Sequence, residues 1–112
     1  MIGYVTLGTN DLDRAARFYD ALLGEIGARR MMQTERFVMW AVAPDKPALG
    51  VFTPYDGKPA TSGNGTMVAL VVDSPAKVEA LHRKALELGA TDEGPAGPRA
   101  IPGINAGQFR DP

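Results

Sequence analysis

The 112-residue sequence contains no cysteine, one histidine and one tryptophan. Without cysteine, the chain has no disulfide, no thiolate nucleophile and no thiolate metal ligand. It has no run of about 18 apolar residues, so we expect no membrane span. Its first residues, Met-Ile-Gly-Tyr, lack the basic start and apolar core of a signal peptide. By this absence of targeting signals, we expect a cytoplasmic protein.

Neither sign of charge is in excess, since 12 Lys and Arg residues stand against 13 Asp and Glu residues. A nucleic-acid-binding domain needs a concentrated basic face, so we expect no nucleic-acid partner. The content of 45% hydrophobic and 22% charged residues is typical of a globular protein. A chain of this length is expected to form one domain.

Residues 3–24 are typical of a strand followed by a helix. Side chains alternate over residues 4–7 in a way that gives the strand one apolar face. Asn10 and Asp11 are both suited to cap a helix N-terminus, and Gly24 stands where a left-handed C-terminal cap is expected. Between them, apolar residues recur with the helical period: Leu12, Ala15, Ala16, Tyr19, Leu22 and Leu23.

A weaker copy of this unit follows in the second half. Residues 67–72 predict another strand, Ser74 is a candidate N-cap, and Pro75 suits the first helical position, where no N–H is needed. An apolar stripe follows and Gly89 ends it, the stripe being Val78, Leu81, Ala85 and Leu88. Met67 stands 63 positions after Tyr4, and Asp73 stands at the same offset from Asn10. The sequence therefore predicts an internal duplication.

The remaining segments complete the first copy but not the second. Strands are predicted over residues 25–33, 37–42 and 49–53, and a Gly-rich polar loop over 56–65 joins the halves. After the second helix, only residues 91–97 and 105–110 predict strands. The final strand of the second copy is apparently missing.

Several short segments, in order and in duplicate, together resemble the vicinal-oxygen-chelate superfamily of glyoxalase I, bleomycin-resistance proteins and extradiol dioxygenases. They are the strand Tyr4-Val5-Thr6-Leu7, then Asp11-Leu12, Phe18-Tyr19 and Leu23-Gly24, the segment 67–73, and the terminal Phe109-Arg110-Asp111-Pro112. The resemblance implies an α+β fold in which two βαβββ modules, residues 1–56 and 64–112, form one glyoxalase-like domain over 1–112. Its curled mixed sheet would enclose a concave cup, with the helices outside. It also implies a homodimer.

The resemblance implies which side chains face the cup. Val5, Leu7, Val68 and Leu70 would face the helices. The residues predicted to line the ligand pocket are Tyr4, Thr6, Phe37, Met39, Phe52, Met67, Ala69, Arg99 and Phe109.

Members of the family usually hold a divalent metal with His and Glu side chains. The two His positions are occupied here by Tyr4 and Met67, and one Glu position by Gly50. The other Glu would lie in the missing strand. A hard cation requires carboxylate or imidazole ligands, so no metal site and no cofactor are predicted, although a divalent metal is not excluded.

Each candidate residue also has a purely structural interpretation. Tyr4, the candidate catalytic residue, would either donate a proton in the cup or pack at the core edge. The aromatic residues would form a ligand wall, the core or a dimer contact, the last two being favoured for Trp40. Arg99 would bind an anion or remain solvated. The one histidine, His82, is expected to be solvated or at a boundary.

Three functions follow as hypotheses. The first is a small-molecule-binding protein with a metal-free cup, as in the bleomycin-resistance branch. The second is a divalent-metal-dependent lyase, isomerase or dioxygenase whose ligands come from loops, with Asp56, Glu93 or Asp111 as candidates. The third is an assembly role in which a partner supplies the missing strand.

Overall fold

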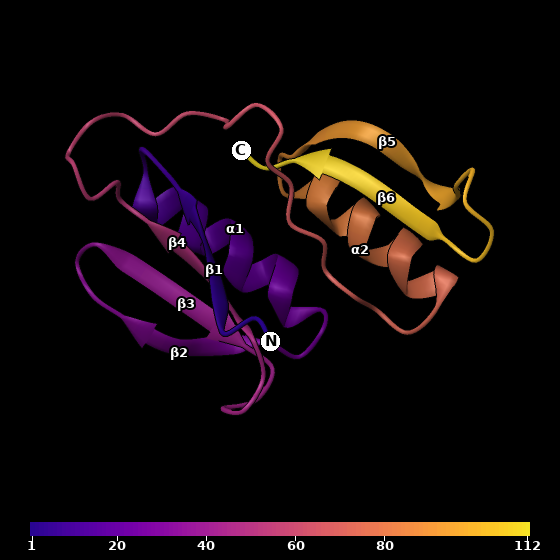
Figure 1. Ribbon diagram of the computed structural model, residues 1–112, viewed down its shortest axis with the longest axis horizontal. Coiled ribbons are helices and arrows are strands. Elements are labelled where there is room, and N and C mark those ends of the chain that lie inside the picture. Colours follow the sequence, from indigo (N-terminus) through magenta and orange to yellow (C-terminus); the bar gives the residue numbers. More distant parts are fainter. The chain divides into compact units, whose positions relative to one another are not determined.

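The computed structural model describes all 112 residues, which form two compact units, residues 1–68 and 69–112. The first unit consists of β1 (Tyr4–Gly8), α1 (Leu12–Gly24), β2 (Arg29–Gln33), β3 (Phe37–Ala41) and β4 (Ala48–Phe52). The second consists of α2 (Pro75–Glu87), β5 (Thr91–Pro98) and β6 (Asn105–Arg110) (Figure 1). Neither helix is long and apolar enough to cross a membrane.

The first unit contains a mixed four-stranded sheet in the order β1-β4-β3-β2. β1 pairs with β4 in parallel, and the other two pairings are antiparallel. The predicted sequence of strand, helix and three strands is therefore confirmed for this half of the chain. β4 lies inside the sheet, and its three middle residues are buried.

Helix α1 covers one face of this sheet, and the core of the unit lies between them. Trp40 on β3 is 1% exposed and its ring lies 5.7 Å from that of Tyr19 on α1. Burial of each large apolar side chain contributes about 1.5–3 kcal/mol. The buried apolar residues of the first unit are Ala16, Phe18, Tyr19, Leu22, Leu23, Ala28, Val38, Trp40, Ala41, Leu49 and Val51. Of the alternatives for Trp40, the core is confirmed.

The two helices begin in the same way, which supports the internal duplication. Each has 13 residues. The Asp11 side chain accepts a hydrogen bond from the Arg14 backbone N–H, and the Ser74 side chain accepts one from Lys77, 63 positions later. Asp11, and not Asn10, is thus the cap of α1.

Their C-terminal ends also match, at a different glycine from the one predicted for α1. Gly27 and Gly89 have φ angles of +82° and +103°. In each case the next residue donates its N–H to a carbonyl five positions earlier, from Ala28 to Leu23 and from Ala90 to Ala85. This is the Schellman arrangement. Gly24 is simply the last residue of α1, because the chain continues for one further tight turn before it reverses.

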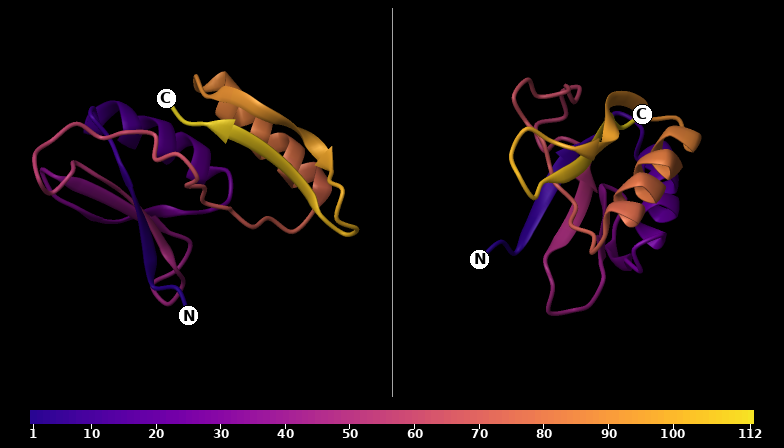
Figure 2. Two further views of the ribbon diagram at one scale, coloured as in Figure 1. Left: turned by 45° about the horizontal axis from the view of Figure 1, so that its top comes forward. Right: turned by 90° about the vertical axis from the view of Figure 1, so that its right-hand side faces the viewer.

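In the second unit, α2 packs against the antiparallel hairpin of β5 and β6, as the views in Figure 2 show. Its buried residues are Leu81, His82 and Ala85. The predicted N-cap Ser74, the first helical residue Pro75 and the terminal Gly89 are all confirmed.

The predicted strand over residues 67–72 is wrong, since this segment has no strand structure. β1, its counterpart, obtains its ladder hydrogen bonds from β4. The second unit has only β5 and β6, and these pair with each other, so the segment has no ladder partner. The fold is therefore a small α+β arrangement of two helices, a mixed four-stranded sheet and a hairpin, and the second βαβββ module is incomplete. A cup shared by both modules, and their union as one domain, stay predictions.

Candidate ligand-binding face

The face of the four-stranded sheet opposite α1 is the candidate site, and we call it the open face. Strand side chains alternate between faces, so the register identifies its residues. Thr6, Gly50, Met39 and Met32 stand side by side in one row across all four strands. Gly8, Phe52 and Phe37 form a second row at one end of the face. Five predicted pocket residues thus share this face: Tyr4, Thr6, Phe37, Met39 and Phe52.

A stacked aromatic pair forms the apolar part of the open face. The rings of Phe37 and Phe52 lie 4.5 Å apart with an interplanar angle of 13°. The Phe52 ring leans over Gly50, because a Cβ added at Gly50 would lie 2.6 Å from Phe52 Cε1 and 3.1 Å from Met39 Cγ. The missing side chain at Gly50 therefore leaves the space above β4 to the Phe52 ring and the Met39 side chain.

The loop after β4 closes the open face at the Gly8 end. A Cβ added at Gly8 would lie 3.2 Å from Ala60 Cβ and 3.9 Å from Pro54 Cγ. The Asn10 side chain fixes the loop at this place: its amide donates to the Ala60 carbonyl at 3.1 Å, and its oxygen accepts from the Ala60 N–H at 2.7 Å. Asn10 therefore holds the loop and does not cap α1. Sequence reasoning missed this role because Asn10 and Ala60 lie 50 positions apart.

A second anchor holds the start of the same loop. The Arg36 guanidinium donates to the carbonyls of Thr53 and Pro54, both at 3.3 Å, and lies 5.4 Å from the Tyr55 ring centroid. The Arg36 carbonyl also accepts from the Thr53 N–H at 2.8 Å. The loop that borders the open face is thus held by polar contacts at two places, with Arg36 at its start and with Asn10 at Ala60.

Polar groups on the open face are few. Tyr4 and Thr6 offer hydroxyl groups from β1, and Tyr4 is 62% exposed. Arg29 stands opposite Ala41 and shares the face of Met39, at the β2 edge. Arg29 is not among the predicted site residues, although the alternation of faces between Arg29 and Arg30 on a strand could have placed it on this face. The face is consequently apolar in the middle, with hydroxyls at one edge and a guanidinium at the other.

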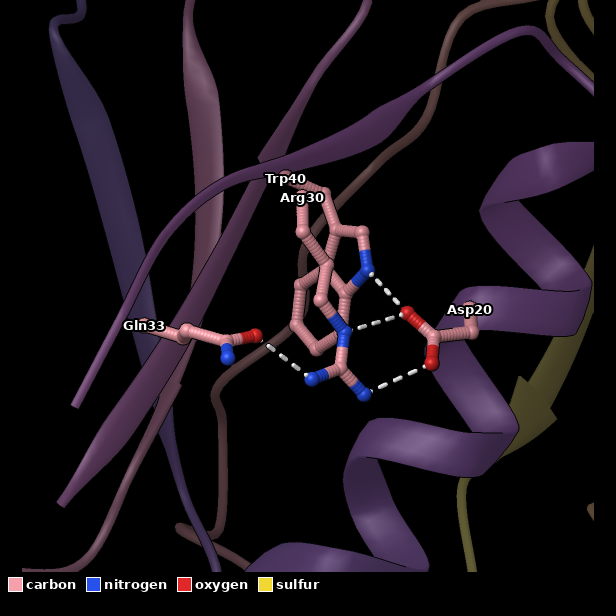
Figure 3. A network of polar contacts seen from close by, with 4 residues as sticks. All are labelled: Asp20, Arg30, Gln33 and Trp40. Carbon is pink, nitrogen blue, oxygen red and sulfur yellow. Dashed lines mark hydrogen bonds and ion pairs between the residues drawn. The ribbon is translucent and has the colours of Figure 1, made fainter. Parts of the chain in front are cut away.

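Arg30, the next residue along β2, points to the α1 side and forms the network of Figure 3. Its guanidinium donates to both carboxylate oxygens of Asp20, at 2.8 and 2.7 Å, and to Gln33 Oε1 at 2.8 Å. The indole N–H of Trp40 donates to the same Asp20 at 2.8 Å. The Arg30 hydrogen bonds, with help from Trp40, hold the pKa of the Asp20 carboxyl below its usual value. This network fixes α1 on the sheet.

The other predicted pocket residues lie outside the open face. Met67 is 72% exposed and Ala69 is exposed, in the segment that forms no strand. The Arg99 guanidinium donates to the carbonyls of Pro95 and Gly97 at 3.0 and 3.1 Å, which ties it to its own hairpin. Phe109 shares a face of β6 with Gly107, whose backbone touches α2, so its position favours packing over ligand contact. Their role in a pocket stays a prediction.

The expectation of a solvated or boundary His82 is wrong, because this residue is 8% exposed. Its Nε2 lies 3.1 Å from the Gln108 carbonyl and 3.3 Å from Asp92 Oδ1, so this nitrogen carries a proton and donates. A Cβ added at Gly107 would lie 2.9 Å from the imidazole ring. The glycine thus admits the ring between α2 and β6, a close approach that the helical pattern alone does not reveal.

The side chains at the expected metal positions do not fit a divalent cation. Tyr4 and Met67 supply a phenol and a thioether, and the volume beside Gly50 is taken by Phe52. No group of three or more His, Cys, Asp or Glu residues is placed to hold an ion. Of the loop candidates, Asp56 accepts from the Lys58 N–H at 2.9 Å and Glu93 pairs with Arg110 at 3.2 Å.

Comparisons with known proteins agree with this geometry. The family model described as the Glyoxalase/Bleomycin resistance protein/Dioxygenase superfamily matches residues 1–112. A glyoxalase/bleomycin resistance protein from Albidiferax ferrireducens is 34% identical with a TM-score of 0.88, over 100% of this chain and 90% of that one. A putative glyoxalase from Bacillus halodurans is 22% identical with a TM-score of 0.74, over 100% of this chain and 88% of that one, and shows the fold alone. The comparison with curated proteins gave no match.

Proposed function

Because the chain belongs to the glyoxalase/bleomycin resistance protein/dioxygenase superfamily, we propose that it binds a small organic molecule on the open face without the usual divalent metal. The observation that carries the proposal is that the Phe52 ring and the Met39 side chain occupy the space above Gly50. It replaces a metal-ligand position by an apolar surface. Flat aromatic compounds are the ligands that such a surface favours, because offset stacking on a Phe ring adds about 0.5–1.5 kcal/mol to the burial of apolar area.

Three features support binding on this face. The Phe37–Phe52 stack offers an aromatic surface, Thr6 and Tyr4 offer hydroxyl donors and acceptors beside it, and the loop at Ala60 closes one end. An apolar surface with a small number of placed polar groups is the usual composition of a small-molecule site. In this proposal Tyr4 is a hydrogen-bonding group for the ligand, and its further role as a proton donor depends on the ligand bound.

The proposal is tested by binding and elemental analysis together. A library of flat aromatic compounds is titrated into the 15N-labelled protein, and amide shifts over β1, β3 and β4 are followed. We expect ligands whose shifts concentrate on the open face and whose affinity falls about tenfold in Phe52→Ala. Phe18→Leu, in the core on α1, is the control variant that leaves the open face intact.

Elemental mass spectrometry of protein purified without chelator tests the metal-free part. About one equivalent of a divalent metal per chain would overturn it and would favour the metal-dependent lyase, isomerase or dioxygenase instead. Native mass spectrometry of the same sample tests the homodimer, which we also propose.

In the NMR titration, a ligand that binds equally well to wild type and Phe52→Ala would refute the open face as the site.

A further inference from the structure

Arg29 is the only charged residue that the strands contribute to the open face. The side chains contributed to this face by β1, β3 and β4 are uncharged: Tyr4, Thr6, Gly8, Phe37, Met39, Ala41, Ala48, Gly50 and Phe52. On β2, Met32 is apolar and Arg29 is the only charged residue facing this side. The strands therefore contribute one positive charge and no negative charge to the open face.

The arginines of the chain differ in what occupies their guanidinium groups. Those of Arg30, Arg36, Arg83, Arg99 and Arg110 donate to carboxylates or carbonyls of the chain. The Arg29 side chain has no hydrogen-bond or ion-pair partner. Arg14 and Arg17 are similarly exposed and without a side-chain partner, but they lie on α1 and not on the open face. Arg29 thus combines a free guanidinium with a place in the row of Tyr4 and Ala41, next to the row of Met39.

We propose, on the basis of the function proposed above, that the ligand is a small aromatic carboxylate whose anionic group is bound by Arg29. A guanidinium presents its N–H groups in a planar fork that matches the two oxygens of a carboxylate. The aromatic body would lie on Met39 and Phe52, and a polar substituent at its far end would meet the hydroxyls of Thr6 and Tyr4. Arg29 is therefore a specificity-determining residue.

The dimensions of the sheet agree with this class of ligand. β1 and β2 are the two edges of the four-stranded sheet, so three strand spacings of about 4.8 Å separate them, or about 14 Å in all. A ligand anion that pairs with Arg29 would draw this long side chain inward from the β2 edge. The interval left between guanidinium and hydroxyls suits one or two fused rings with short substituents.

The test compares two probes of the same shape, the anionic 2-naphthoate and the neutral 2-naphthamide. Their affinities are measured by NMR titration for wild type, Arg29→Gln, Arg29→Lys and the matched control Arg17→Gln. We expect wild type and Arg17→Gln to prefer the carboxylate about tenfold. Arg29→Gln should bind both probes equally, and Arg29→Lys should recover part of the preference because it keeps the charge without the fork. The preference should also weaken between 0.05 and 0.5 M salt, on the order of the screening expected for exposed charges.

The outcomes separate this inference from the proposed function. If Arg29→Gln keeps the tenfold preference, or if wild type has none, the inference is overturned while binding on the open face stands. If neither probe shifts open-face amides in wild type, the proposed function fails and the inference fails with it. Circular dichroism of each variant confirms that its fold is intact. If Arg29→Gln does not fold, Arg29→Lys and the salt series decide the question.

Discussion

Removal of the Asp20 carboxylate is expected to destabilise the first unit chiefly by leaving the Trp40 N–H without an acceptor. Asp20→Ala breaks two contacts at once, the ion pair with Arg30 and the hydrogen bond from Trp40. The ion pair is partly exposed, with side chains 38% and 41% accessible, so its loss costs only about 0.2–1 kcal/mol. A buried donor left unsatisfied costs about 1–3 kcal/mol, and Trp40 is 1% exposed. The expected total is about 2 kcal/mol in the free energy of unfolding.

A double-mutant cycle with Trp40→Phe separates the two terms. In the Trp40→Phe background there is no indole N–H, so Asp20→Ala should cost only the ion-pair part, roughly 0.5 kcal/mol. The free energies come from urea unfolding at pH 7, followed by far-UV circular dichroism because Trp40 is the single tryptophan. Glu35→Ala, an exposed carboxylate in the turn after β2, is the control and should change stability by less than about 0.5 kcal/mol.

An equal cost of Asp20→Ala in both backgrounds would refute this reasoning. The pH dependence gives a second check on Asp20. Its pKa is lowered from 3.8, first by the hydrogen bonds of Arg30, so the folded state favours the charged carboxylate. The stabilisation is complete above that ordinary value and is lost as the pH falls through the lower pKa of the folded state. The difference between wild type and Asp20→Asn should therefore shrink in acid.

Three further substitutions test close contacts that lie within one unit or the other. Gly50→Ala should cost about 1–3 kcal/mol in stability by urea unfolding, because the new Cβ would meet the Phe52 ring at 2.6 Å; an unchanged midpoint would show that Phe52 moves freely. Gly107→Ala should destabilise α2 and its hairpin by a similar amount, seen as faster amide exchange in α2, because it displaces His82. Asn10→Ala should speed exchange of the Ala60 amide about tenfold, the equivalent of one lost hydrogen bond, and equal exchange would mean that the loop is held by other contacts.

Local periodicity was sufficient to predict most of the fold. The helical stripes, the caps at Ser74 and Gly89 and the strands of the first unit depend on residues near in sequence. They were found where the pattern indicated, except that the strand predicted over residues 25–33 begins only at Arg29. The strand predicted over residues 67–72 was wrong because strand formation also requires a hydrogen-bonding neighbour, which a local sequence pattern does not reveal. The prediction of Gly24 as the left-handed C-terminal cap was wrong because the chain reverses one turn later, at Gly27.

The candidate site was predictable only in part, for the same reason. Alternation placed Tyr4 and Thr6 on one face, and the register added Phe37, Met39 and Phe52 to it. The hydrogen bonds between Asn10 and Ala60 join residues that are far apart in the sequence. The same is true of the packing of His82 against Gly107. Contacts of this kind depend on the packing of whole elements. Such contacts can be identified only when the positions of the helices and strands in the structure are known.

The contact above Gly50 also constrains how this protein can change through mutation. A single replacement of Gly50 by glutamate would have to place its side chain where the Phe52 ring and Met39 already lie. A smaller residue at position 52 or 39 would have to come first, and it would weaken the stack with Phe37 before any carboxylate had been gained. The acquisition of a carboxylate at position 50 is therefore a path of at least two steps whose first step is a loss. Substitutions at this place change the shape of the apolar surface more readily than they add a charged group.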